Sequence, residues 1–340
     1  LIRPMVPMEI RSSVSRSKLL YFFTIQLIAF FIILSPKIII TKKRINMKEI
    51  YKSRLILVTL IGMLMFYLFN SNLVIVSILD YTEIFMKKLF PVSFIFFIIS
   101  SLLSDYGIIT FLDRVFHVRT TNLYIFLISM ISGFPSGSKY TKDLYNNGIV
   151  GVNEANRMLM FSHFPNPLFM ISSLTLVIND NKIIRCLLLA IILSNLIILI
   201  FSRKTQEYKS TYTINDDFSK GLVKAIHNSL KVLITIYGVS IFFYLIACII
   251  INTFDINGIL YVIICGVFDL TKGIYSSILI SNVYLRGLVV LLFISFGGIS
   301  IHLQVKSILL DTSIKYKYFF IGRVIGTFLA IIIFNILYFI

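Results

Sequence analysis

Long apolar stretches without a charged side chain constrain this sequence more than any other feature. Three of them, residues 55–79, 232–254 and 324–340, contain no Asp, Glu, Lys, Arg or His. A helix of about 20 apolar residues crosses the hydrocarbon core of a bilayer, which is roughly 30 Å thick. Only 14% of the 340 residues are charged, whereas a soluble domain carries about 25% charged residues. The sequence therefore predicts an all-α membrane protein, a multi-pass helical bundle.

The formal net charge of +17 comes from basic residues that gather beside the apolar stretches. Lys and Arg are concentrated in residues 3–18, 37–54 and 203–231. Basic clusters next to membrane helices favour retention on the cytoplasmic side and contact with anionic lipid headgroups. We therefore expect the lipid bilayer as a partner. We expect no nucleic acid, because the sequence indicates no basic domain outside the membrane.

Neither a catalytic site nor a cofactor is indicated by the residue patterns. Cys186, Cys248 and Cys265 lie singly in apolar runs, without the CxxC spacing of a zinc site or of a redox pair. The sequence has no HExxH, GxSxG or P-loop motif, and its four histidines are scattered. We expect no enzyme, no catalytic residue, no metal and no cofactor.

The most polar stretch divides the apolar sequence into two membrane halves. We expect a first half at 47–201, a polar loop at 202–231 and a second half at 232–340. Residues 1–46 are expected to be an N-terminal extension or anchor, with Met47 as an alternative start of the protein.

Eight apolar segments after residue 46 are candidate membrane helices. They are 55–79, 89–104, 120–137, 164–178, 183–201, 230–254, 285–302 and 317–340. If the basic clusters at 37–54 and 203–231 are both cytoplasmic, an even number of crossings must separate them, yet five candidates lie between them. One is therefore expected to be broken or re-entrant. Interruptions at corresponding positions of two loosely repeated halves are typical of a transporter's central site.

The first interruption is the sequence GFPSGSK at residues 133–139. Its proline removes a backbone donor, and its two glycines allow the chain to leave helical geometry. We expect Ser136 or Ser138 to cap a new helix, whose N-terminus inside a membrane would bind an anion or a polar solute. The alternative is an ordinary loop with its lysines at the headgroups. The candidate substrate-binding residues here are Gly133, Pro135, Ser136, Gly137 and Lys139.

A second interruption follows at residues 162–169, where two prolines flank Asn166. Prolines free upstream carbonyls, and an amide or imidazole side chain can hydrogen-bond a solute. A lone histidine near an interface is more often structural, so that alternative stays open. The candidate residues are His163, Asn166 and Pro167.

The second half contains a carboxylate and another glycine break. Asp269 follows an apolar run, where a carboxylate is costly and by default functional, as in proton or cation coupling; pairing with Lys272 is the structural alternative. Residues 297–304 repeat the pattern of glycine break, cap and polar side chains. Arg323, seven residues into the last apolar segment, is expected to extend to the membrane interface. The candidate residues are Asp269, Thr271, Gly297, Gly298, Ser300 and Gln304.

Five motifs together resemble the sporulation integral membrane protein YlbJ family, which is grouped with the nucleoside-recognition or Gate-domain membrane proteins. The motifs, in chain order within residues 55–335, are 133–139, Glu154-Ala155, 166–169, 269–273 and 297–304. The resemblance implies a multi-pass cell-membrane protein of an endospore former that acts in spore formation and passes a small polar solute. Two departures from the family pattern stand out. Asp269 stands where Glu is more usual, and Pro165 and Asn166 stand where smaller residues are expected.

Three hypotheses about function follow. A transporter or permease-like protein for a small polar solute is favoured by the paired interruptions and the buried carboxylate. A membrane scaffold that recruits partners during spore assembly is the main alternative, and a membrane-embedded enzyme is a third. Homo-oligomerisation is left open.

Overall fold

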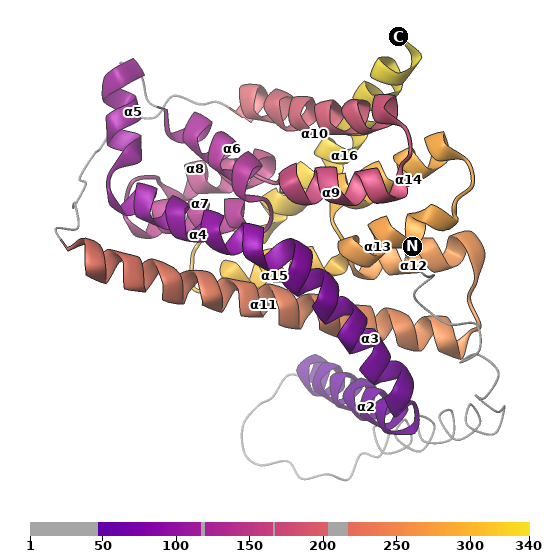
Figure 1. Ribbon diagram of the computed structural model, residues 1–340. Helices are drawn as coiled ribbons and strands as arrows, with labels where there is room; N and C mark the ends of the chain where they lie inside the picture. Colours follow the sequence, from indigo (N-terminus) through magenta and orange to yellow (C-terminus); the bar gives the residue numbers. More distant parts are fainter. Residues whose placement is uncertain (1–46, 117–119, 166, 203–216) are drawn as a thin grey trace, which may run out of the picture. The chain divides into compact units, whose positions relative to one another are not determined.

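The computed structural model describes residues 47–116, 120–165, 167–202 and 217–340, all of whose regular elements are helical (Figure 1). Expectations for residues 1–46 lie outside the described part of the chain. The helices in chain order are α2 (Met47–Phe69), α3 (Ser71–Ile84), η2 (Phe85–Leu89), α4 (Phe90–Asp105), α5 (Ile108–Phe116), α6 (Thr121–Ser132), α7 (Ser136–Asn146), α8 (Val152–Phe161), α9 (Pro167–Val177), α10 (Asn181–Ser202), α11 (Phe218–Thr253), α12 (Gly258–Phe268), α13 (Leu270–Ser276), η3 (Ser277–Leu279), α14 (Val283–Phe296), α15 (Ile299–Ile308) and α16 (Tyr316–Phe339).

Five helical stretches are long and apolar enough to cross a membrane. They are Tyr51–Phe69, Asn181–Ser202, Phe218–Thr253, Val283–Ile308 and Tyr316–Phe339. A bent pair, Ser71–Leu89 with Ser93–Asp105, could form one further span. The predicted class, an all-α multi-pass membrane protein, is confirmed.

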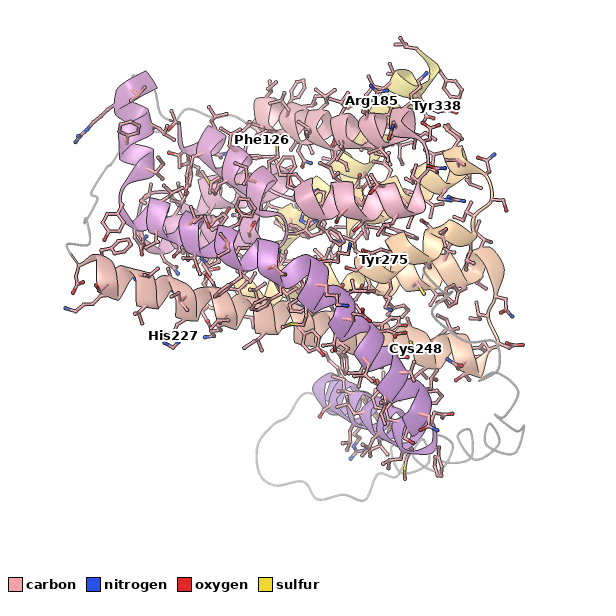
Figure 2. All side chains as sticks on the ribbon, in the orientation of Figure 1. Phe126, Arg185, His227, Cys248, Tyr275 and Tyr338 are labelled. Carbon is pink, nitrogen blue, oxygen red and sulfur yellow. The ribbon has the colours of Figure 1, made fainter. Side chains whose placement is uncertain are left out.

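The described residues form two compact units. The first contains α2, α3 up to Glu83, and residues 245–256 at the end of α11 and just beyond it. Within it, the thiol of Cys248, labelled in Figure 2, donates to the Ser77 hydroxyl over 3.7 Å. Many apolar side chains of α2, such as Leu55 and Leu64, are exposed. Lipid tails are as apolar as these side chains, so an exposed apolar helix face is stable in a membrane.

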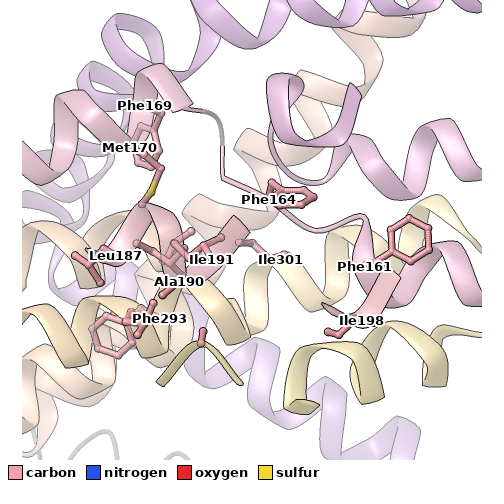
Figure 3. Packing of buried hydrophobic residues seen from close by; sticks show 14 of the residues in the cluster. Phe161, Phe164, Phe169, Met170, Leu187, Ala190, Ile191, Ile198, Phe293 and Ile301 are labelled. Carbon is pink, nitrogen blue, oxygen red and sulfur yellow. The ribbon is translucent and has the colours of Figure 1, made fainter. Parts of the chain in front are cut away.

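The second unit spans Ile84–Tyr244 and Asn257–Ile340. It contains the predicted interruptions at 133–139 and 162–169 and the glycine break at 297–304. Its apolar core draws on α8, α9, α10, α14 and α15, as Figure 3 illustrates with Phe161, Met170, Leu187, Phe293 and Ile301. Helix α16 packs against α8, α10 and α14. This unit positions every candidate site residue that the structure describes.

Several helices of the second unit are too short to cross a bilayer. Helix α6 has 12 residues, and α9 and α12 have 11 each. At about 1.5 Å per residue, even α6 is only about 18 Å long. The segments 120–137 and 164–178, predicted as crossings, are therefore half-length helices, which agrees with the predicted broken elements.

Two boundaries differ from the sequence prediction. The segment 55–79 was predicted as one helix, but α2 ends at Phe69 and α3 begins at Ser71. Asn70 lies between them, and both its backbone N–H and its side-chain amide donate to the Phe66 carbonyl, over 2.9 and 3.0 Å. Such side-chain bonds compete with the helical pattern. In addition, residues 218–231 of the predicted polar loop are helical, as the start of α11.

A close approach of α16 to the end of α8 depends on Gly322. A Cβ atom built at Gly322 would lie 2.4 Å from the Met160 carbonyl oxygen, whereas one at Gly238 of α11 meets nothing within 4 Å. Gly322→Ala should therefore destabilise the protein by about 1–3 kcal/mol through overpacking. Gly238→Ala, the matched control, should stabilise it by about 0.5–1 kcal/mol through backbone entropy.

The measurement is thermal unfolding in detergent. A thiol-specific dye reports it, because the three cysteines are buried and react only when the protein unfolds. Equal midpoints for the two alanine variants would contradict the close packing of α16 on α8.

Candidate functional site: two broken helices around His163

Two glycines in the left-handed region end the two broken helices. Helix α6 stops at Gly133, where φ is 80°, and α14 stops at Gly297, where φ is 83°. Glycine adopts this conformation without steric cost and commonly terminates helices for that reason. New helices start within three residues, α7 at Ser136 and α15 at Ile299. Both predicted glycine breaks, at residues 133–137 and 297–298, are present.

The serines after the first break do not cap α7, so this prediction was wrong. Ser136 donates its hydroxyl back to the Gly133 carbonyl, and Ser138 donates to the Pro135 carbonyl over 2.6 Å. Pro135 holds the N-cap position without a side-chain cap. The hydroxyl groups instead satisfy carbonyls that the break leaves without helical partners.

The start of α7 packs directly on the chain that leaves α8. A Cβ atom at Gly137 would lie 1.8 Å from the Ser162 carbonyl oxygen and 2.8 Å from the Ser129 hydroxyl. Only a residue without a side chain fits this contact. Gly137 is therefore required for packing, a role that its position in the motif alone did not reveal.

His163 lies between the two breaks. Its imidazole stacks on Phe134 with the ring centroids 4.5 Å apart, and its Nε2 is 3.6 Å from the Cβ position of Gly297. The side chain is only 3% exposed, and its Nε2 has no hydrogen-bond partner among the described residues. The two interruptions, more than 150 residues apart in sequence, are thus brought together around one buried ring.

A further break, between α12 and α13, joins this arrangement at Asp269. Helix α12 ends at Phe268, and the Asp269 carboxylate caps α13 by accepting the Lys272 backbone N–H over 3.1 Å. Its other oxygen accepts the Ser300 hydroxyl of α15 over 3.2 Å. A Cβ atom at Gly298 would lie 3.1 Å from both the Gly266 carbonyl oxygen and the Leu270 backbone nitrogen. The α14–α15 break therefore packs against the α12–α13 turn.

Only the backbone N–H of Lys272 is bonded to Asp269 in the contacts described above, so the predicted charge pairing of the two side chains stays a prediction. The ammonium group of Lys272 lies over the ring of Tyr244, 4.5 Å from its centroid. Thr271, in the first turn of α13, is also buried.

The helices that follow the two glycine breaks contact each other. Helix α7 packs on α15, and Lys142 donates to the Ile308 carbonyl at the end of α15 over 2.7 Å. On α15, Gln304 donates to the Ser240 hydroxyl of α11 over 3.0 Å. Gln304 is buried, so its predicted contact with a solute stays a prediction.

Of the remaining candidates, Lys139 is buried rather than placed at the surface. Its ammonium lies 3.3 Å from an Asp143 carboxylate oxygen and 5.2 Å from the Tyr140 ring centroid. Pro167 begins α9, and Asn166 lies outside the described residues.

Arg323 was not among the candidate site residues, and its predicted position was wrong. Instead of extending to the interface, it is 1% exposed and donates to the carbonyls of Met160, His163 and Ser295 and to the Asn195 side chain, over 2.8–3.3 Å. Met160 and Ser295 lie in the last turns of α8 and α14, whose final carbonyls lack helical partners. The five fixed donors of a guanidinium suit such a cluster of acceptors.

One sequence signal could have indicated this role. Arg323 lies within an apolar span and is flanked by Gly322 and Gly326, and glycines are the residues that allow membrane helices to approach closely. A basic residue between two such glycines is better read as facing the bundle interior than as facing lipid.

These observations define a multi-pass helical membrane protein with interrupted helices that meet around buried polar groups. The chain is similar to the sporulation integral membrane protein YlbJ of Bacillus subtilis (strain 168), with 25% identity and a match that covers 73% of each protein. The resemblance to that family, expected from the five motifs, is confirmed by this match. No protein-family model matches the chain, and no solved structure matches it either. The wider grouping with Gate-domain proteins therefore stays a prediction.

Replacing Arg323 by Met should strongly destabilise the protein, because it leaves several buried acceptors without donors. Each unsatisfied group costs about 1–3 kcal/mol, so we expect a loss of about 3 kcal/mol or more and a melting temperature lower by roughly 5 °C or more. Arg323→Lys should lie between the wild type and Arg323→Met, since one ammonium cannot reach all four acceptors.

The matched control is Arg185→Met. Arg185 (Figure 2) is an exposed residue of α10 that donates to the Asn181 carbonyl over 3.2 Å. Its replacement should change stability by less than about 0.5 kcal/mol. Similar melting temperatures for Arg323→Met and Arg185→Met, measured with the thiol dye, would show that the guanidinium does not hold the helix ends.

Proposed function

We propose that this protein carries a small polar solute across the cell membrane of a spore-forming bacterium and acts in spore formation. The observation that carries the proposal is the meeting of two glycine-broken helices around His163, inside an apolar helical bundle. The similarity to YlbJ, a sporulation integral membrane protein, supports the role in sporulation. Interrupted helices that meet in this way are typical of transporter binding sites.

Buried polar atoms without partners support a binding role for this junction. They are contributed by four elements around it, and none finds a hydrogen-bond partner among the described residues: Ser129 Oγ, His163 Nε2, Ser295 Oγ and Arg323 Nε. A bundle stabilised by packing alone gains nothing from such atoms, since each costs about 1–3 kcal/mol. A polar solute, or water in its place, would supply the missing hydrogen bonds.

The described arrangement is closed around these groups. Ser136 and Ser300 are fully buried, and His163 is nearly so. A carrier that works by alternating access must therefore open the packing between α7, α15 and the chain after α8. We propose no catalytic reaction and no resident cofactor for this site.

Cysteine labelling tests whether the junction opens. In a variant without the three native cysteines, Ser136→Cys and Ser300→Cys should react slowly with a membrane-impermeant maleimide in proteoliposomes at rest. Both should react faster when a transported solute and an ion gradient are supplied. Ser313→Cys, at an exposed position between α15 and α16, is the matched control and should react rapidly in both conditions. Unchanged protection of both buried positions during solute flux would rule out a path through this junction.

Flux measurements on the purified protein in liposomes test transport itself. The panel should contain nucleosides, organic anions and organic cations, each under proton and sodium gradients. If none of them moves, the scaffold hypothesis replaces transport. It predicts that deletion of residues 203–216 blocks spore formation whereas Gln304→Ala does not.

A further inference from the structure

We propose that Asp269 is a proton-binding site that controls the contact between α15 and the α12–α13 turn, and through it the coupling of the carrier to a proton gradient. This inference rests on the proposed transport function. The two oxygens of this carboxylate bond two different elements, the Lys272 backbone amide of α13 and the Ser300 hydroxyl of α15. One ionisable group thus joins the α12–α13 break to the α14–α15 break.

The charge of the carboxylate strengthens both bonds. Hydrogen bonds to an ionised acceptor are roughly twice as strong as those between neutral groups, and a negative charge is also favoured at the N-terminus of α13. Protonation removes this charge and converts one acceptor oxygen into a donor. The Ser300 hydroxyl then loses a strong acceptor, and the α15 contact weakens.

Capping alone does not explain a charged residue at this place. Asn282 caps α14 with the same geometry, since its side-chain oxygen accepts the Leu285 backbone N–H over 2.9 Å. Asp180 accepts the backbone N–H groups of Lys182 and Ile183 at the start of α10, but in a half-buried position. Asp269 is only 2% exposed, and a carboxylate in the interior of a membrane bundle is costly unless its charge has a function.

The backbone next to Asp269 is tight enough to transmit a local change. Gly298 packs against the α12–α13 turn so closely that its Cβ position lies 3.3 Å from the Asp269 Cα. Gly297 of the same break approaches His163. A shift of α15 away from Asp269 therefore also alters the junction around His163, where we propose that the solute binds.

Other ionisable groups around Asp269 are basic, aromatic or thiol groups. On α13, on α12 and α14 packed against it, and on α15 they are Tyr261 and Cys265 (α12), Lys272 and Tyr275 (α13), Tyr284 and Arg286 (α14), and His302 and Lys306 (α15), while Tyr244 of α11 lies against the Lys272 ammonium. Helix α9 carries no ionisable side chain.

Two members of this set have bonds of their own. Arg286 donates to the carbonyls of Val177 and Ile280 over 2.6–2.9 Å, and the His302 Nδ1 pairs with the Tyr316 hydroxyl at 2.7 Å. Asp269 is the only carboxylate in this set.

Spin-label distances in the full-length protein test the inference independently of transport. Labels at Ile263→Cys of α12 and Leu303→Cys of α15, both exposed positions, report the contact in nanodiscs at pH 8 and pH 5. In the otherwise wild-type chain, the distance should increase at the lower pH. Asp269→Asn, which keeps the cap but not the charge, should show the longer distance at both pH values.

Two further variants separate titration from folding. Ser300→Ala leaves the carboxylate in place but removes the α15 bond, so it should lose the pH dependence as well. Asp180→Asn removes a half-buried capping charge at the start of α10 and should retain the full pH response of the wild-type chain. Melting temperatures near that of the wild type would show that both variants are folded.

Flux measured on the same proteins distinguishes the two proposals. If the distance between the two labels does not change with pH in a protein that still transports, the proposed role of Asp269 is wrong. The proposed transport function is then still supported. A pH-dependent distance that is lost in Asp269→Asn, without any solute flux, supports the proton-controlled contact and overturns the carrier. Loss of proton-driven flux in Asp269→Asn, together with loss of the distance change, supports both.

Discussion

The buried guanidinium of Arg323 is the interaction on which the rest of the second unit depends. Every helix that ends inside a bundle leaves its last carbonyl groups without helical partners, and a membrane interior has no bulk water to satisfy them. Arg323 reaches the final turns of α8 and α14 and the chain between α8 and α9 at once. Helix ends can therefore lie deep in this bundle because one side chain supplies donors to several of them.

Glycine geometry makes these ends possible, but the two halves satisfy them differently. Both breaks start at a glycine with positive φ, Gly133 and Gly297. After the first, serine hydroxyls turn back to the freed carbonyls. After the second, Ser300 bonds the carboxylate of Asp269, a residue outside its own broken helix. Both halves use a glycine with positive φ at the break, but at the second break the serine bonds an ionisable side chain of another element.

The sequence predicts the breaks well and their partners poorly, for a physical reason. Gly and Pro inside apolar runs change local backbone preferences, which a sequence displays directly. Hydrogen-bond partners depend on packing between distant segments, such as Arg323 with the Met160 carbonyl 163 residues away. The same limit explains the wrong expectation for Arg323 and the wrong capping role of Ser136. The break at Asn70 was missed because a single polar residue in an apolar run is normally tolerated in a helix.

The polar groups of the junction divide into those that are satisfied and those that are not, and the division has a functional meaning. Groups such as the Arg323 terminal nitrogens and the Asp269 oxygens are bonded, and they hold elements in fixed positions. The Nε2 of His163 and the Oγ of Ser295 have no partner among the described residues. Bonded groups set the geometry, whereas unbonded ones retain the capacity to bind something else. In the proposed carrier, the solute would bond to atoms that hold no helix end in place, so binding and structural stability would depend on different atoms of the same few residues.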